Sequence, residues 1–536
     1  MSEPTAVQLK DEGNDFFRKQ DYVGALAKYT EAIALDDKNA VLYANRAACH
    51  HGLNRCLDAV DDAKMATQID PGYAKGWSRL AASRDALAEW ERSAEAWQKA
   101  LDALPKTNLS RAEQRQKDQY SAGLDAAKTR DKTAESPSVS RFKAEDANLP
   151  WKIATEMLPE LRKAGPEKYS SSAWVISYAY EEFTKGVAFM NEFKSIPHPQ
   201  APGGFAYGGN TMGLTYLTNG LMRDERAFHL DGPDWITKYN NQVKFEATAR
   251  QAWHSDGVEN IKQLAQKRLK EKGWSDVRPA LSVTVRAWIM RGMLDGHLRN
   301  KPDTGVQFLK RAVDLLEWGR NVWKNVHKDD RGAIFQDTFL RGVRSLHLKM
   351  FMNAYSADPG LNSKFPLEHL KEEAEDLLKE IDIMKASNNL SKEELDPGMV
   401  SSFCIYPAAV AYTMIGFYHA QTARHSDDVL ACISFANGAS AYLQAAGTYP
   451  EDDEFHAFYL SCAMDCMRNA GLPIRGFNLA AVTLRAAVPK MMKIWTVSAL
   501  QQGGRDEKIQ ANLRSADEIM KLVAEGKLTL EDPVPL

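Results

Sequence analysis

A 34-residue repeat near the N-terminus constrains this chain more than any other feature of its sequence. Residues 6–107 hold three copies in register, which begin at Ala6, Ala40 and Ala74. Small residues recur at positions 8 and 27 of each copy, namely Gly13, Ala47 and Ala81, and Ala32, Ala66 and Ala100. Position 32 holds proline in two copies and Asp37 in the first. This spacing predicts two antiparallel helices per copy, which meet closely at the small positions and end where proline cannot continue a helix.

The repeat also places large residues where such helices leave gaps. These are Leu9, Tyr43 and Trp77 at position 4, and Tyr29 and Trp97 at position 24, where the second copy has Ala63. The pattern resembles the tetratricopeptide repeat, which implies a superhelix of three helix pairs. We expect helices at 7–18, 22–35, 40–52, 55–69, 74–87 and 90–103. A polar helix at 109–129 should cap the array, because a terminal repeat needs a polar outer face.

The repeats are predicted to form a domain of residues 1–129, and the rest of the chain divides once more. Residues 130–149 are rich in Lys, Ser, Thr and Asp, with few apolar side chains to bury, and are predicted to be a linker. Residues 150–536 are predicted to form a large helical domain, because they lack the alternating apolar pattern of strands. The Pro- and Gly-rich segment 196–210 is expected to be a loop.

The fold class is therefore predicted to be all-α, a three-repeat superhelix followed by an α-solenoid or helical bundle. Some distal helix pairs look like divergent copies of the same repeat. Trp288 and Gly292, followed by Phe308 and Ala312, reproduce its spacing to within one residue. Matches of so few positions are common in helical proteins rich in Ala and Gly. Both a divergent repeat array and an unrelated helical domain therefore stay open.

One segment is long and apolar enough to require a membrane test. Residues 397–423 contain no Asp, Glu, Lys or Arg, a length that could cross a bilayer. However, Pro407, His419 and Gln421 interrupt the run, and alanine outnumbers leucine and isoleucine together. We therefore expect a buried helix here.

The composition excludes several classes of protein. The chain has 68 Lys and Arg against 71 Asp and Glu, without the basic excess of a nucleic-acid reader. Six cysteines in 536 residues are too few for a disulfide scaffold, and none form a CxxC pair with zinc spacing. The first residues do not follow the pattern of a secretory signal. We expect a cytoplasmic protein.

Five polar residues of the repeats can all donate hydrogen bonds to an anionic ligand. Lys10 and Asn14 are four residues apart on one helix face, and so are Lys75 and Arg79 on the first helix of the third copy. Asn45 lies on the first helix of the second copy. If the first helices line a groove, these side chains bring three positive charges and two amides to it. Such donors suit a ligand with two neighbouring carboxylates.

The segments LKDEGN, YANRAA and YAKGWSRLAAS resemble the dicarboxylate-clamp repeats of heat-shock co-chaperones. The resemblance covers about residues 6–129. It implies that Lys10, Asn14, Asn45, Lys75 and Arg79 bind a terminal carboxylate. The partner it implies is the C-terminal Glu-Glu-Val-Asp tail of the 70-kDa or 90-kDa heat-shock chaperones. The chain would then be an adaptor whose distal domain binds a client or a second partner.

The alternative is an enzyme whose helical catalytic domain, residues 150–536, is brought to chaperones by the repeats. No phosphate-binding loop, HExxH or GxSxG motif supports it, so we expect no catalytic residue, no cofactor and no metal site. Cys462 and Cys466 are four apart on an apolar helix and are expected to be buried thiols. A deep pocket with convergent titratable groups would favour the enzyme, and a shallow apolar groove the adaptor.

Overall fold

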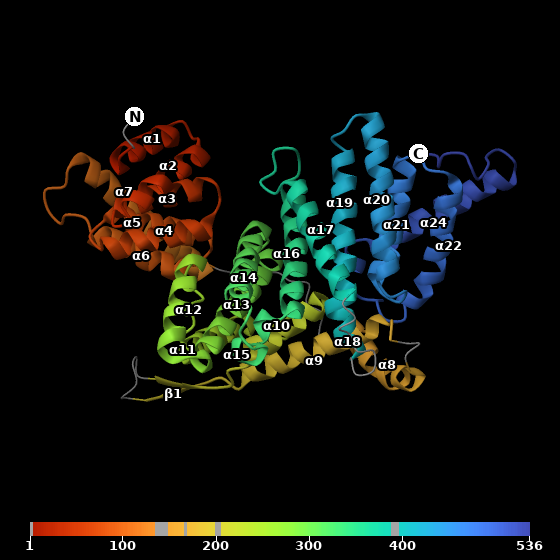
Figure 1. Cartoon of the computed structure of the whole chain (residues 1–536), viewed down its shortest axis with the longest axis horizontal. Coiled ribbons are helices and arrows are strands. Elements are labelled where there is room, and N and C mark those ends of the chain that lie inside the picture. Colours follow the sequence, from red (N-terminus) through yellow and green to blue (C-terminus); the bar gives the residue numbers. More distant parts are fainter. Residues whose placement is uncertain (1–3, 134–147, 166–168, 199–204, 387–395) are drawn as a thin grey trace. The chain divides into compact units, whose positions relative to one another are not determined.

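The computed structural model describes residues 4–133, 148–165, 169–198, 205–386 and 396–536. Over these ranges the chain is almost entirely helical, which confirms the predicted all-α class (Figure 1). It divides into two compact units, residues 1–137 with 255–264, and residues 138–254 with 265–536. The domain limits at 129 and 150 remain predictions, because residues 134–147 of the predicted linker lie outside the described residues.

The N-terminal unit consists of three helix pairs and a capping helix. They are α1 (Ala6–Arg18), α2 (Tyr22–Leu35), α3 (Ala40–Gly52), α4 (Cys56–Ile69), α5 (Ala74–Ala86), α6 (Trp90–Asp102) and α7 (Arg111–Thr133). The bounds of the first six agree with the predicted ranges to within one residue. The starts of α1, α2 and α3 are fixed by side-chain caps from Thr5, Asp21 and Asn39, which accept bonds from backbone N–H groups of the first turn.

Close packing occurs where the repeat places its small residues. A Cβ atom added to Gly13 would lie 2.8 Å from the ring of Tyr29, so α1 and α2 meet with no room for a side chain. The alanines at the equivalent positions of the other copies are fully buried. The capping helix α7 uses the same device, because a Cβ on Gly123 would lie 2.6 Å from the ring of Trp97.

The 34-residue period extends to the backbone of the turns. Gln20, Asn54 and Ala88 end the first helix of each pair, and their φ angles are 62°, 58° and 54°. This left-handed region is costly for residues with a Cβ, although asparagine tolerates it. Gln20 and Ala88 therefore hold less suitable side chains than Asn54.

The distal unit is a longer succession of helices. They are α8 (Pro150–Ala164), α9 (Ser172–Asn191), α10 (Gly213–Arg223), α11 (Trp235–Arg250), α12 (Val258–Lys272, which begins in the other unit), α13 (Trp274–His297), α14 (Pro302–Val322), α15 (Lys328–Arg331), α16 (Asp337–Ala357), α17 (Leu367–Ala386), α18 (Pro397–Val400), α19 (Tyr406–Ala423), α20 (Asp428–Thr448), α21 (Glu454–Asn469), α22 (Ile474–Met491), α23 (Ala499–Gln502) and α24 (Arg505–Ala524). Short 3₁₀ turns lie at η3 (Glu225–Ala227) and η4 (Ala333–Phe335), and a π turn at η5 (Ser401–Ile405). Many sequential helices pack against each other, most extensively α19 with α20, α9 with α10 and α20 with α21 (Figure 1).

The pair α13–α14 meets closely at a glycine, as the helices of the first repeat do. A Cβ on Gly292 would lie 3.4 Å from the Cβ of Phe308, sixteen residues away along the chain. Gly13 and Tyr29 have the same separation in sequence, but the Cβ on Gly292 would lie closer, at 3.0 Å, to Gly305 O and Leu309 Cγ than to Phe308. Gly416 of α19 meets Tyr442 of α20, twenty-six residues away, so this pair does not keep the sixteen-residue separation.

The prediction that the distal region has no strands is wrong. Strands β1 (Lys194–Pro197) and β2 (Phe205–Gly208) form an antiparallel hairpin, with Lys194 opposite Gly208 and Pro197 opposite Phe205. The ring of Phe193 stacks on Tyr207 at 5.9 Å and meets the edge of Phe245, so aromatic contacts hold the base of the hairpin against α11. Strands of four residues are too short to give a detectable alternation in sequence. The tip of the predicted loop, residues 199–204, lies outside the described residues.

The uncharged segment 397–423 forms the continuous helical run α18–η5–α19, and 67% of its most apolar window is buried, as predicted. A second helix of the described chain, α20, also has the length and composition to cross a membrane, but only 33% of its window is buried. The two neighbours therefore differ sharply in how much apolar surface they expose.

Candidate peptide-binding site

The five polar residues that the sequence singles out lie on the first helices of the three repeats. Lys10 and Asn14 are on α1, Asn45 is on α3, and Lys75 and Arg79 are on α5. Helix α3 packs against α5 as well as against its own partner α4. The first helices of successive repeats are therefore neighbours, as the predicted groove requires.

Two of the five side chains are in direct contact. Asn45 Nδ2 donates to Asn14 Oδ1 at 3.3 Å, which joins α1 to α3. The same oxygen accepts a shorter bond, 2.7 Å, from the hydroxyl of Tyr29 on α2. With Oδ1 engaged twice, Asn14 Nδ2 has no partner among the described residues and can donate to a ligand. Burial raises the pKa of Tyr29 to about 12, so its hydroxyl stays a neutral donor.

Sequence reasoning assigned Tyr29 to packing alone and missed this second role. The ring does pack, against Gly13, but the hydroxyl fixes which way the Asn14 amide faces. The signal lies in the comparison of copies. Position 24 carries Ala63 and Trp97 in the other two repeats, so only the first copy can place a tyrosine hydroxyl there.

The three cations of the set differ in their surroundings. Lys10 Nζ lies 3.7 Å from the carboxylate of its neighbour Asp11, which is exposed. Lys75 and Arg79 are exposed, and in the described part of the chain no carboxylate forms an ion pair with either. His51 adds no charge at neutral pH, since burial and then the charge of Arg79 lower its pKa. No hydrogen bond between described residues joins Lys75 or Arg79 to the two asparagines.

These five side chains offer hydrogen-bond donors and positive charge, and the Oδ1 acceptor of Asn14 is already engaged. Two ammonium groups, one guanidinium group and one free amide N–H can each bind a carboxylate oxygen, and the guanidinium can do so with two parallel bonds. Lys75 and Arg79 are exposed and so stay hydrated until a ligand replaces the water, whereas Lys10, Asn14 and Asn45 are partly buried. The arrangement suits an acidic peptide end better than a neutral or basic one.

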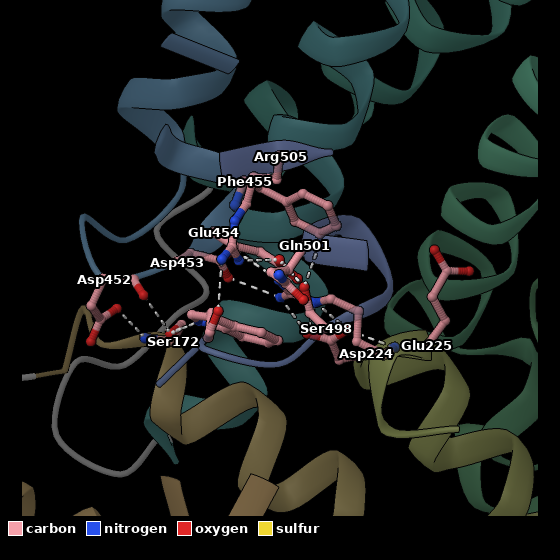
Figure 2. Close-up of polar contacts among 12 residues, drawn as sticks. Ser172, Asp224, Glu225, Asp452, Asp453, Glu454, Phe455, Ser498, Gln501 and Arg505 are labelled. Carbon is pink, nitrogen blue, oxygen red and sulfur yellow. Dashed lines mark hydrogen bonds and ion pairs between the residues drawn. The ribbon is translucent and has the colours of Figure 1, made fainter. Parts of the chain in front are cut away.

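The distal unit contains a buried cluster of charges that the sequence did not reveal (Figure 2). Arg226 in η3 donates two bonds to Asp453, both at 2.9 Å, and binds Asp224 with its Nε at 2.9 Å and Nη2 at 2.7 Å. Its guanidinium is stacked between the rings of Phe455, at 4.2 Å, and Trp495, at 3.9 Å. Although burial raises the pKa of Asp453, the charge of Arg226 outweighs it and holds that pKa below its ordinary value.

A second ion pair completes this cluster, which we name the Arg226 clasp. Arg505 Nη1 donates to Glu454 Oε2 at 2.8 Å, and Ser498 donates to the same oxygen. Burial raises the pKa of Glu454. The clasp ties η3, the start of α21 and the start of α24 together, and its donors and acceptors are directed at one another (Figure 2). It therefore resembles a structural joint more than a site open to substrate.

The distal unit also has a groove of about 460 Å³ between α8 and α9. Its walls are mostly apolar, including Leu158, Tyr178, Tyr180 and Ala188, with Glu181 and Lys185 among the polar residues. Cys462 and Cys466 lie elsewhere, and burial raises the pKa of both thiols to about 12, so they are protonated. In the described ranges, no group of three or more His, Cys, Asp or Glu residues is placed to hold a metal ion.

Comparison with known proteins finds relatives for the N-terminal unit, although no family model matches the chain. It is 45% identical over 97 residues to small glutamine-rich tetratricopeptide repeat-containing protein 2 of Saccharomyces cerevisiae, covering 18% of this chain and 28% of the relative. It is 40% identical over 96 residues to the heat shock protein sti1 homolog of Schizosaccharomyces pombe, covering 18% and 16%. A third relative is the heat-shock protein cognate co-chaperone sgt12 of Aspergillus fumigatus, 35% identical over 100 residues, which are 19% of this chain and 29% of the relative.

The chain thus matches less than a third of the length of each of these relatives, and the matching segments amount to about 100 residues of this chain. Two of the three are named as heat-shock or co-chaperone proteins and one as a tetratricopeptide repeat protein. The predicted resemblance is confirmed over this segment: the N-terminal repeats are similar to tetratricopeptide segments of heat-shock co-chaperones.

Proposed function

We propose that this chain is a co-chaperone adaptor whose N-terminal repeats bind the C-terminal Glu-Glu-Val-Asp tail of a 70-kDa or 90-kDa heat-shock chaperone. The observation that carries the proposal is the set of five donors on α1, α3 and α5, in which Asn14 and Asn45 are joined and Lys75 and Arg79 have no carboxylate partner among the described residues. The similarity of this segment to co-chaperones supports it.

In this proposal Lys10, Asn14, Asn45 and Lys75 surround the terminal aspartate with its two carboxylates. Arg79 reaches toward the upstream part of the tail or the side chain of that aspartate. Donors to charged acceptors contribute roughly 1.5–3 kcal/mol each. A few of them give about 8 kcal/mol, which corresponds to a micromolar dissociation constant.

The distal unit would bind a client or a second protein. The mostly apolar groove between α8 and α9 and the closed arrangement of the Arg226 clasp support binding over catalysis. We further propose that the protein acts in the cytoplasm, where its proposed partners present their tails.

Calorimetric titration of the full chain with a peptide ending in Glu-Glu-Val-Asp tests the clamp. Replacing Lys75 and Arg79 together by alanine should weaken binding by about two orders of magnitude, given about 1.4 kcal/mol per tenfold change. The same peptide with its terminal carboxylate blocked as an amide should lose a similar amount. Thermal melting should hardly change, because both side chains are exposed and alanine is a good helix former.

A matched control is the double variant Lys38→Ala with Arg55→Ala. It removes one lysine and one arginine from exposed positions outside the first helices, so it changes the net charge equally. Its affinity should stay within about twofold of the original. Undiminished binding by the folded Lys75 and Arg79 variant, or equal binding of the amidated peptide, would refute the assignment.

A further inference from the structure

Helix α20 is a solvent-exposed helix whose only charged residue is Asp428, at its first position. Residues 429–450 contain no Asp, Glu, Lys, Arg or His. The helix packs against α19 and α21, and its remaining face is open within the distal unit. On that face Val429 is 71% exposed and Ile433 is 54% exposed. A helix at the surface normally carries charged residues on its open side, so an open apolar face of this length indicates a binding surface.

The open face follows a regular spacing. Steps of four and three residues alternate along it, which is the heptad spacing of two helices that pack along a common seam. We define the α20 seam as the six residues in this line, Val429, Ile433, Ala436, Ser440, Leu443 and Gly447. Five of them are exposed and Ala436 is partly exposed. Three are large and apolar, and three are small.

The order of large and small residues makes the seam complementary to itself. In an antiparallel pair related by a twofold axis near residue 438, Val429 of one copy faces Gly447 of the second copy. Ile433 faces Leu443, and the small residues Ala436 and Ser440 meet at the centre. Each end then combines a large with a small side chain, as close packing of helices requires. A parallel pair would instead place Val429 against itself at one end and Gly447 against itself at the other.

We propose that two copies of this chain associate through the α20 seam as an antiparallel, twofold-symmetric dimer. The absence of charge favours a second copy as the occupant, because a partner with charged residues on its matching face would bury them unpaired. A copy of the same helix brings an equally uncharged face, and a twofold contact uses one patch on both subunits. This proposal is independent of the peptide-binding function.

The dimer should be weak and reversible. A stable interface buries about 1,200–2,000 Å² in total, which is large compared with a single pair of helices. The fraction of dimer should therefore rise with protein concentration over the micromolar range. Full-length protein at low concentration would be largely monomeric.

Disulfide trapping tests both the contact and its direction. Val429→Cys and Gly447→Cys are prepared separately in full-length protein that carries Cys432→Ser, since Cys432 is exposed on the same helix. A Cβ at Gly447 meets nothing within 4 Å, so the site accepts a side chain. An antiparallel dimer yields a crosslinked pair only when the two proteins are mixed. In each protein alone the two copies of the cysteine would be about 27 Å apart, given about 1.5 Å of rise per residue.

The opposite result, crosslinks within each protein alone and none in the mixture, would indicate a parallel pair and overturn the proposal. Crosslinking in neither experiment would also overturn it. In the same samples, hydrogen–deuterium exchange or thermal melting confirms that each variant is folded.

Sedimentation equilibrium from roughly 1 to 100 micromolar protein provides the second measurement. We expect Ile433→Glu to be monomeric throughout, because it buries a charge in the seam. Val482→Glu on α22 should dimerise like the original, since Val482 is equally exposed at 52% but lies outside the seam. A monomeric original chain, or a dimer that survives Ile433→Glu, would contradict the proposal. Binding to neutral phosphatidylcholine vesicles that Ile433→Glu abolishes would assign the seam to a lipid surface instead.

Discussion

Replacing Tyr29 by phenylalanine removes one hydroxyl group from beneath the candidate site and keeps the ring that packs against Gly13. That hydroxyl is buried and donates to Asn14 Oδ1 at 2.7 Å. A hydrogen bond of this kind contributes about 0.5–1.5 kcal/mol, so the free energy of unfolding of the repeats should fall by about 1 kcal/mol. Asn14 then keeps only the 3.3 Å bond from Asn45, and its amide can turn away from the groove.

The same loss of orientation should weaken peptide binding. We expect the affinity for a peptide ending in Glu-Glu-Val-Asp to fall about threefold to tenfold, since 1.4 kcal/mol corresponds to a factor of about ten. Titration calorimetry on the full chain measures the affinity, and urea unfolding measures the stability. The assay separates the two effects, because a stability loss of this size leaves the repeats folded under binding conditions.

Tyr43→Phe is the matched control. Tyr43 is a buried tyrosine of the second repeat, and no hydrogen bond of its hydroxyl occurs among the described residues. Its substitution should leave the peptide affinity unchanged. The reasoning fails if Tyr29→Phe binds the peptide as tightly as the original chain, or if the two variants lose affinity equally.

Three further predictions follow from the packing and charge of the two units. Ala88→Gly should raise the free energy of unfolding of the repeats by about 0.5–1 kcal/mol, because Ala88 holds a φ of 54° that disfavours a Cβ. Gly123→Ala should lower it by about 1–3 kcal/mol, because the added Cβ would collide with the ring of Trp97. Urea unfolding of both variants checks the opposite signs. Arg226→Met should destabilise the distal unit by about 3–5 kcal/mol, because it leaves the carboxylates of Asp224 and Asp453 buried without their guanidinium partner. Peptide affinity should not change. A thermal melt that matches the original would disprove the stabilising role of the clasp. Burial raises the pKa of Glu246 above 4.5, so the folded state binds this proton more tightly than the unfolded chain, and the resulting stability is lost as the pH rises through the raised pKa. Glu246→Gln should therefore gain stability relative to the original as the pH rises from roughly 5 to 8; a difference that does not vary with pH in denaturant titrations would contradict this.

The repeats could be predicted closely because their contacts are local. Gly13 meets Tyr29 sixteen residues later, and the same spacing recurs in each copy, so one pattern determines both helix ends and packing. The candidate site could be located for the same reason, since a spacing of four residues puts Lys75 and Arg79 on one helix face. What the pattern could not indicate was the hydroxyl of Tyr29, whose role depends on the direction of a single bond.

The distal unit was predicted only in outline because its decisive contacts are not local. Arg226 binds Asp453, 227 residues away in sequence, and no short-range spacing signals such a pair. The hairpin β1–β2 was missed because four-residue strands carry too little alternation, and Phe193 holds it through contacts with distant rings. The exposure of α20 was equally invisible, since its composition matches that of the buried α19.

The Arg226 clasp has a consequence for the order in which the chain folds on the ribosome. Arg226 leaves the exit tunnel long before Asp453, and Arg505 follows later still. The charged residues of η3 are therefore unpaired with Asp453 until the ribosome has synthesised it. At about 5–20 residues per second, the roughly 280 residues between Arg226 and Arg505 take on the order of tens of seconds to translate. The N-terminal repeats, whose contacts are local, are complete throughout that interval. The nascent protein therefore displays finished groove helices while its larger half still lacks the joint that closes its core.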